Sequence, residues 1–258
     1  WDYQYTGGSS AGELSNLGDK RVAVIGTGAT AIQCIPHLGP AAKELYVFQR
    51  TPSAVDLRNN SLTDIDWLQN QDTGWQAKRR RNYESIISGM PVEEDLVDDG
   101  WTEAFKDLFA FMQDHDLLKS GAEGIAKAME IADLKKMEKI RNLASDILND
   151  QETAENLKPY YRWLCKRPCF NDDYLKTYNL PNAHLIDTNG KGVTRITSKG
   201  VVANDIEYEV DCIIFATGFE VGTDYSRRAG YGIYGRGEIN IEEKFSMTTG
   251  YESLFGMH

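Results

Sequence analysis

The stretch that decides the fold is Arg21-Val-Ala-Val-Ile-Gly-Thr-Gly-Ala-Thr-Ala31. Its first five residues form a short apolar run rich in β-branched side chains, which is typical of a buried strand. Two glycines follow at once, and residues 30–38 then repeat apolar side chains at helical spacing. The stretch therefore predicts a strand, a tight glycine turn and a helix.

The residues that follow extend this unit. Gly39-Pro40 is expected to end the helix, and Leu45-Tyr-Val-Phe48 is expected to form a second strand. A strand, glycine turn, helix and second strand within about 30 residues make a βαβ unit with parallel strands. The pattern Gly-x-Gly-x-x-Ala is weak evidence alone, since it also occurs in structural turns. In this context it predicts dinucleotide binding.

Each small residue of the turn has a separate reason to be there. Gly26 lets the chain turn sharply out of the strand, and Gly28 lets the backbone approach a pyrophosphate. Ala31 is small enough for the helix to pack close to the strand, while the helix N-terminus presents free N–H groups and a positive dipole end. The residues expected to bind the cofactor here are Gly26, Thr27, Gly28, Ala29, Thr30 and Ala31.

The end of the second strand indicates which dinucleotide is bound. An NAD site usually has Asp or Glu there, whereas this chain has Gln49-Arg50-Thr51. A carboxylate would repel a ribose 2′-phosphate, but Arg50 can hold one through bidentate hydrogen bonds and Thr51 can add a hydroxyl. We expect NADP(H), with Gln49, Arg50 and Thr51 in its site. The alternative is an ordinary surface arginine at a strand end.

The middle of the chain predicts helices. Residues 61–160 are densely charged, and apolar side chains recur at helical spacing over residues 102–118 and 133–148. Asp133 is a candidate N-cap of the second of these helices. We interpret residues 61–160 as a helical insertion with a solvated surface.

Strand patterns return after Pro168. A short apolar run is followed by three alternating segments with turn residues between them, which favours an antiparallel meander, and then by a buried strand. These are residues 183–186, the meander 193–197, 200–203 and 206–210, and residues 212–216, which lead into Ala216-Thr217-Gly218.

The fold class expected is therefore α/β, a Rossmann-like parallel sheet with a three-stranded β-meander and a helical insertion. The expected organisation is a linker at 1–20, an NADP(H)-binding domain at 21–60 and 161–218, the insertion at 61–160, and a returning segment at 219–258.

Composition limits the functional classes. The formal net charge of −11 argues against a nucleic-acid binder, which usually has a basic face. No apolar run approaches the ~20 residues of a membrane span. The cysteines are few, and Cys165 and Cys169 lack a second Cys/His pair at zinc spacing, so neither a disulfide framework nor a metal site is expected. Reduced thiols favour a cytoplasmic location.

Two adjacent cations, Lys166 and Arg167, precede Pro168. Neighbouring side chains in an extended segment point to opposite sides, so the two can serve different partners. One can reach a phosphate while the other faces a reaction centre. Spacing alone does not distinguish this from two exposed cations in a linker.

Together these segments resemble the NADPH domain of Baeyer–Villiger-type flavin monooxygenases. The motifs that carry the resemblance are Gly26-Thr-Gly-Ala-Thr-Ala31, Val47-Phe-Gln-Arg-Thr-Pro52, Cys165-Lys-Arg-Pro168, Asn171-Asp-Asp-Tyr174 and Phe215-Ala-Thr-Gly-Phe219. They occur in the family's order, and the likeness is weakest across the insertion. Trp1-Asp2 looks like the end of a family fingerprint that precedes the NADPH domain, so we expect a piece of a longer protein.

The resemblance implies roles for individual residues. Arg50, Thr51 and Lys166 would hold the 2′-phosphate of NADPH. Arg167 would match the catalytic arginine that stabilises the anionic peroxyflavin. Ala216, Thr217 and Gly218 would match the turn between the two dinucleotide domains. No second glycine motif follows a strand, so the FAD site is expected in the missing FAD domain of the same polypeptide.

The activity implied is insertion of an oxygen atom from O₂ beside the carbonyl of a small-molecule ketone, which gives an ester or lactone. This chain alone is expected to be inactive. Two alternatives remain open. One is the NADPH domain of an N-hydroxylating or heteroatom-oxidising flavin monooxygenase, and the other is a non-catalytic NADP(H)-sensing module.

Overall fold

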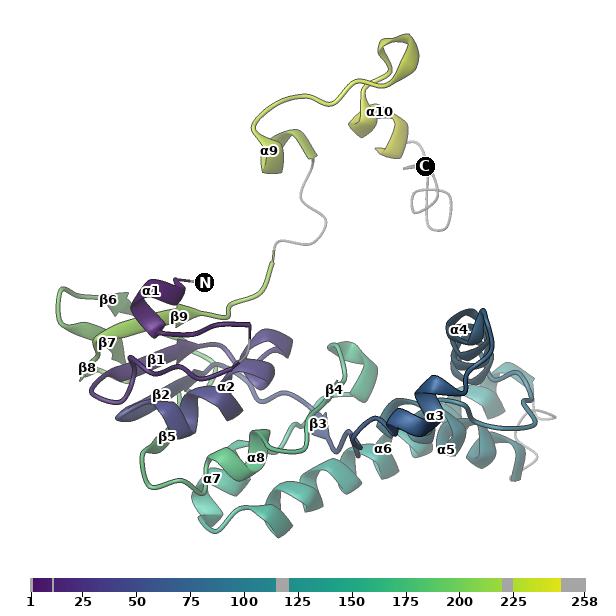
Figure 1. The fold of residues 1–258 in the computed structure, drawn as a ribbon, viewed down its shortest axis with the longest axis horizontal. Helices are drawn as coiled ribbons and strands as arrows, with labels where there is room; N and C mark the ends of the chain where they lie inside the picture. The colour runs from purple at the N-terminus through teal and green to yellow at the C-terminus, as the bar shows by residue number, and fades with distance from the viewer. Residues whose placement is uncertain (1, 11, 115–120, 220–224, 247–258) are drawn as a thin grey trace. The chain divides into compact units, whose positions relative to one another are not determined.

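The computed structural model describes residues 2–10, 12–114, 121–219 and 225–246. The chain forms two compact units, residues 1–217 and 218–258 (Figure 1). Three of the sequence-based expectations fall partly outside the described residues. They concern Trp1, the end of the helix at 115–118, and the returning segment at 220–224 and 247–258.

A four-stranded parallel sheet forms the centre of the first unit. Its strands are β1 (Arg21–Ile25), β2 (Glu44–Gln49), β5 (Ala183–Asp187) and β9 (Cys212–Phe215), in the order β5-β2-β1-β9. Ile25 is paired with Phe48 on one side and Phe215 on the other, so the carboxyl ends of three strands meet at one edge. The predicted parallel sheet is confirmed. The prediction that the last strand is buried is wrong, because β9 lies at the sheet edge and Phe215 is 62% exposed.

Helix α2 (Ala29–Ala41) covers one face of the sheet with the buried side chains Ala31, Ile32, Ile35 and Leu38. The prediction that Gly39-Pro40 ends this helix is wrong, since the helix continues to Ala41. Asn182 explains the extension, because its Nδ2 donates to the carbonyls of Gly39 and Ala42 at 2.9 and 2.8 Å. Carbonyls that a helix end would leave without donors are thereby satisfied.

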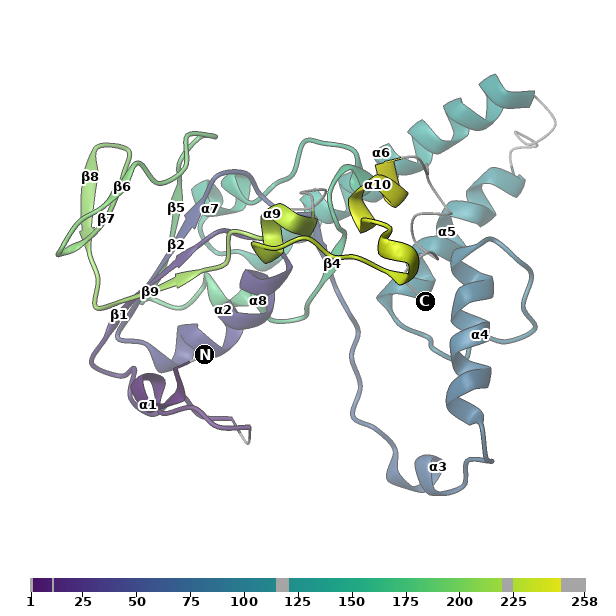
Figure 2. The same ribbon diagram turned by 90° about the horizontal axis from the view of Figure 1, so that it is seen from above.

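The predicted meander covers the other face. It consists of β6 (Arg195–Ile196), β7 (Gly200–Ala203) and β8 (Ile206–Glu209), paired antiparallel. Ala23 and Phe48 of the sheet pack against Val201 and Ala203, and the Phe48 ring meets Tyr208 edge-on at 5.3 Å. Figure 2 shows the meander and α2 on opposite sides of the sheet.

The insertion is helical, as predicted. Its helices are α3 (Ile65–Gln69), α4 (Trp75–Ile87), α5 (Gly100–Asp114), α6 (Gly121–Ile147) and α7 (Gln151–Asn156). The prediction that Asp133 is an N-cap is wrong, because α6 begins twelve residues earlier, at Gly121. Small buried side chains, Ala128 and Ala132, extend the packed face of α6 where sequence periodicity is weak.

Two further contacts fix the segments on either side of the insertion. Strand β3 (Val55–Asp56) pairs in parallel with β4 (Cys169–Phe170), a ladder that the sequence did not predict. Lys136 of α6 forms a buried ion pair with Asp56. The other short elements are α1 (Tyr3–Thr6), the 3₁₀ turn η2 (Trp163–Cys165) and α8 (Tyr174–Thr177).

The second unit contains α9 (Tyr225–Ala229), the 3₁₀ turn η3 (Arg236–Glu238) and α10 (Ile241–Ser246). An isolated antiparallel bridge joins Tyr234 and Asn240. Across both units, no described helix combines the length and apolar character that crossing a bilayer requires.

Asp172 anchors the start of the insertion and generates a stability prediction. Its carboxylate accepts from the backbone N–H groups of Arg58, Asn59 and Asn60 at 2.8, 2.9 and 3.1 Å. Burial alone would raise the pKa of Asp172, but these donors outweigh it and hold the pKa below its ordinary value. Asp172→Asn should therefore lower the free energy of unfolding at pH 7 by about 1–3 kcal/mol.

The sign of the pH dependence follows from the lowered pKa. The contribution of Asp172 is complete above the ordinary Asp value of about 4 and is lost as the pH falls through the lower folded value. Urea unfolding of both proteins from pH 7 to pH 3 should show their difference shrinking as the pH falls. Asp173→Asn is the matched control, because the Asp173–Lys176 pair is exposed and long at 3.4 Å. A difference that stays constant with pH contradicts the assignment.

Candidate dinucleotide-binding site

The turn after β1 is built around a close approach of two backbones. Gly26 has φ +110°, and a Cβ there would lie 2.4 Å from the carbonyl oxygen of Ala216. The Gly26 N–H donates to the Phe48 carbonyl at 3.0 Å, and the Ala216 N–H donates to the Ile25 carbonyl at 2.9 Å. Only glycine fits both the backbone angle and the space. The structure thus brings the predicted residues Gly26 and Ala216 together. Thr217, which follows Ala216, is exposed, and so is Gly218, the first residue of the second unit.

The N-terminus of α2 is open. Gly28 is its N-cap, with φ −80°, and a Cβ there would meet nothing within 4 Å. No side chain caps the helix, and its first turn contains no acidic residue. The first N–H groups of this 13-residue helix are therefore not capped by a side chain, and its positive dipole end is not met by an acidic residue of the first turn. Ala31 is fully buried beneath the turn, Ala29 is half-buried and Thr30 is exposed.

Thr27 ties the glycine turn to the segment after β2. Its Oγ1 donates to the Thr51 carbonyl at 3.0 Å, and Ser53 Oγ donates to the Thr27 carbonyl at 2.6 Å. Two hydrogen bonds therefore fix the turn against the residues that follow Arg50. Sequence reasoning missed Ser53, because a serine four residues after a strand end carries no distinctive spacing.

A cationic group lies at the end of β2. Arg50 is exposed, and the ammonium of Lys166 donates to Thr51 Oγ1 although 115 residues separate the two in sequence. Partial burial and, second, the nearby Arg50 guanidinium lower the pKa of Lys166. The structure thus brings Arg50, Thr51 and Lys166 together. No carboxylate of the described residues pairs with either cation, so an anion would find both available.

Gln49 is placed differently from its neighbours. Its side chain is fully buried, and Nε2 donates to the Asn156 carbonyl at 2.7 Å and to Asp187 Oδ1 at 3.1 Å. The amide is therefore committed to α7 and β5, away from the cations. Its Oε1 is buried without a hydrogen-bond partner in the described part of the chain.

Arg167, the second of the two adjacent cations, is exposed. Lys166 has φ −128° and ψ 164°, so its backbone is extended as the sequence predicts, a conformation that favours opposite directions for neighbouring side chains. The Arg167 side chain is exposed, and its carbonyl accepts a weak bond from Cys169 Sγ at 3.5 Å. Within the described ranges its guanidinium has no hydrogen-bond or ion-pair partner. It is available to a group outside these residues.

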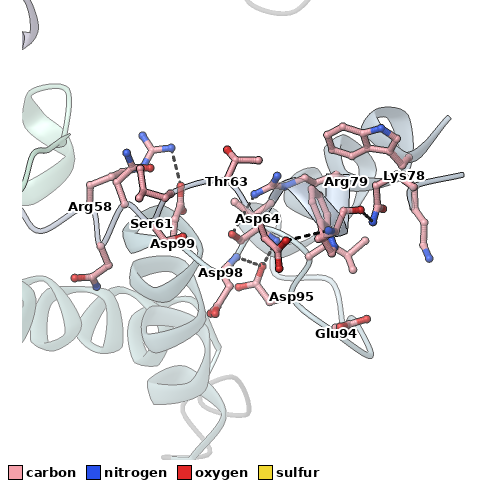
Figure 3. Close-up of a pocket in the computed structure, with 18 residues that line it drawn as sticks. Arg58, Ser61, Thr63, Asp64, Lys78, Arg79, Glu94, Asp95, Asp98 and Asp99 are labelled. Carbon is pink, nitrogen blue, oxygen red and sulfur yellow. Dashed lines mark hydrogen bonds and ion pairs between the residues drawn. The ribbon is translucent and has the colours of Figure 1, made fainter. Parts of the chain in front are cut away.

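A cavity in the insertion lies apart from this site. It is lined by the segment from Arg58 to Asp64, by α3 and α4, and by residues 94–99 (Figure 3). Arg58 pairs with Asp99 inside it at 2.8 Å, and Asp95 of its wall pairs with Lys106 at 2.8 Å. None of the sequence-predicted site residues lines the cavity. Among the described residues, no cluster of His, Cys, Asp and Glu could hold a metal ion.

Comparisons with known proteins identify similar chains. No protein-family model matches the sequence. The Baeyer-Villiger monooxygenase ATR8 of Stachybotrys chlorohalonatus is 48% identical over 259 residues, which cover 100% of this chain and 41% of the relative. The chain therefore spans about two-fifths of the length of this relative.

Solved structures of monooxygenases are also similar to most of this chain over less than half of their own length. The polycyclic ketone monooxygenase of Thermothelomyces thermophila superposes with a TM-score of 0.79 at 40% identity, over 96% of this chain and 41% of that one. A cyclohexanone monooxygenase mutant from Rhodococcus sp. Phi1, solved with NADP⁺, has a TM-score of 0.64 at 28% identity over 91% of this chain and 45% of that one.

The two glycines of the turn make a matched pair for a test. Gly26→Ala places a methyl group against a backbone carbonyl at positive φ, so it should lower the free energy of unfolding by about 3 kcal/mol. Gly28→Ala enters open space at an ordinary φ and should change it by less than about 1 kcal/mol. Urea unfolding of both variants measures these two changes in the free energy of unfolding. Equal stability losses would show that the two strand ends do not meet as described.

Proposed function

Because the chain belongs to the Baeyer–Villiger monooxygenase family, we propose that it is the NADP(H)-binding part of a flavin-dependent monooxygenase. The full-length enzyme would insert one oxygen atom beside a ketone carbonyl. The observation that carries the proposal is the group formed by Arg50, Thr51 and Lys166 next to an uncapped helix N-terminus. The similar cyclohexanone monooxygenase, solved with NADP⁺, supports it.

The donor set suits a ribose 2′-phosphate. Such a phosphate is a dianion near pH 7, and two cations with a nearby hydroxyl match its charge and its acceptor oxygens. Each cation lacks a carboxylate partner among the described residues, so binding breaks no existing ion pair. A carboxylate in their place would instead favour a free 2′-hydroxyl.

The remaining contacts of the dinucleotide follow from the turn. The open space at Gly28 leaves room for a pyrophosphate against the first N–H groups of α2, and the dipole end of this helix favours a negative charge there. We assign Gly26, Ala31 and Ala216 to shaping the cradle, because their backbone and side-chain atoms set how closely β1, α2 and β9 approach.

Arg167 has a different proposed role. When both cofactors are bound, NADPH supplies a hydride and FAD supplies the chemistry that activates oxygen. Arg167 would supply a fixed positive charge to the oxygen anion that attacks the ketone, which is most effective in a dry pocket. Its exposure, the lack of a hydrogen-bond or ion-pair partner for its guanidinium among the described residues, and the extended backbone at Lys166 support this assignment. We further propose that residues 1–20 and 219–258 connect to the FAD-binding part of the polypeptide.

Cofactor preference is the first test of the proposal. We expect NADPH to bind the chain more tightly than NADH in calorimetric titrations. Arg50→Ala should cost about 1.5–3 kcal/mol for NADPH and little for NADH, because only NADPH carries the phosphate. Lys43→Ala is the matched control, since it removes an exposed cation that precedes β2 instead of following it. Equal affinities of the wild-type chain for the two cofactors contradict the proposal.

The second test separates the two adjacent cations in the full-length enzyme. Lys166→Ala should mainly raise the apparent KM for NADPH. Arg167→Ala should leave NADPH binding unchanged and reduce ester formation by roughly 10²–10³-fold, the usual effect of losing one donor at a developing anion. Measuring NADPH consumption and ester formation in parallel distinguishes these effects. Near-wild-type ester formation by Arg167→Ala rules out its catalytic role.

A further inference from the structure

Tyr161 makes two contacts that lie on different parts of its side chain. The Lys166 ammonium lies over the ring, 4.6 Å from its centroid. The hydroxyl accepts a hydrogen bond from the Ala54 backbone N–H at 2.8 Å. The ring therefore faces the cationic group, while the hydroxyl is bound to the segment that follows β2.

The insertion fixes the position of this ring. Tyr161 packs against a buried cluster that combines Ala54 with side chains of α5 and α6 and with Trp163. The backbone N–H of Trp163 donates to the carboxylate of Asp133 in α6 at 2.7 Å. On the other side of Tyr161, the Pro159 carbonyl accepts from Arg141 of α6 at 3.0 Å. Both neighbouring segments are thus bound to α6, so the ring has a defined orientation.

Two effects oppose a fixed position of the Lys166 ammonium near Thr51. Its ammonium lies near the Arg50 guanidinium, and this repulsion contributes to its lowered pKa. A free lysine side chain also samples many rotamers. The negative face of an aromatic ring attracts an ammonium group. Here the ammonium of Lys166 lies over the Tyr161 ring and at the same time donates to Thr51 Oγ1.

We propose that Tyr161 is a positioning residue whose ring holds the Lys166 ammonium at Thr51 and thereby sets the preference of the site for a dinucleotide with a ribose 2′-phosphate. This rests on the proposed function. Tyr161 itself touches neither the phosphate nor a reacting atom in this account. It acts by keeping Lys166 in place before the ligand arrives, so that less freedom is lost on binding.

Two substitutions separate the ring from the hydroxyl. Tyr161→Phe keeps the ring and removes the acceptor of the Ala54 N–H, whereas Tyr161→Leu removes the ring. If the ring acts through Lys166, Tyr161→Leu should weaken NADP⁺ binding by ~3–10-fold and NAD⁺ binding by less than about 2-fold. Tyr161→Phe should keep the wild-type ratio of the two affinities, even if it unfolds at a lower temperature.

A double-mutant cycle completes the binding test. Calorimetry on the full chain with NADP⁺ and NAD⁺ should show that Tyr161→Leu no longer changes the affinity ratio once Lys166→Ala is present. Equal losses for both dinucleotides, or the same effect in the Lys166→Ala background, would overturn the proposal and leave Tyr161 a packing residue.

A second measurement does not depend on dinucleotide binding. The ring should shift the Lys166 ε-methylene proton resonances upfield in the ligand-free chain, and this shift should persist in Tyr161→Phe and vanish in Tyr161→Leu. Absence of the shift in the wild-type chain overturns the proposal even if Tyr161→Leu fails to fold. A wild-type chain that shows the shift but does not prefer NADP⁺ contradicts the proposed function, and with it the specificity role, but not the placement of Lys166.

Discussion

The approach of the Gly26 backbone to the Ala216 carbonyl determines where the carboxyl ends of β1 and β9 meet. A side chain at Gly26 would separate them, because its first carbon would lie 2.4 Å from that oxygen. With the two strands in register, the N-terminus of α2 opens at the same edge of the sheet as the end of β2. This is the edge at which open α/β sheets bind their ligands.

The cationic group depends on a second constraint, which the insertion supplies. Arg50 and Thr51 follow β2 directly, but Lys166 comes from a segment that returns after the insertion. Helix α6 holds that segment through the bond from Trp163 to Asp133, and it holds β3 through the buried Lys136–Asp56 pair. Removing one partner of such a buried pair is costly. The insertion thus places a residue of the site instead of only adding surface.

Local patterns predicted the sheet domain well. The βαβ unit, the meander and the extended backbone at Lys166 depend on short-range periodicity and turn residues, and the structure contains all of them. The errors come from long-range packing. Asn182 donates to carbonyls at the end of α2 from 140 or more residues away, and Asp133 accepts from Trp163 instead of capping a helix.

In the candidate site, too, the contacts that depend on long-range packing could not be predicted from the sequence. Arg50 and Thr51 could be assigned from their place after a strand, whereas Lys166 was assigned from a family resemblance. Tyr161 could not be identified, because a tyrosine five residues before a lysine has no characteristic spacing. The side chain of Gln49, the last residue of β2, points into the interior, and its amide donates to the Asn156 carbonyl and to Asp187. Which strand-end side chains face the ligand depends on what covers each face.

The most direct measurement of the central claim is a ³¹P NMR titration of the 2′-phosphate of NADP⁺ bound to the chain. The second pKa of a phosphate monoester is about 6. Arg50 and Lys166 should stabilise the dianion, so the bound 2′-phosphate should stay dianionic at pH values where the free one takes up a proton. If the bound phosphate titrates as it does in free NADP⁺, the group formed by Arg50, Thr51 and Lys166 does not hold it.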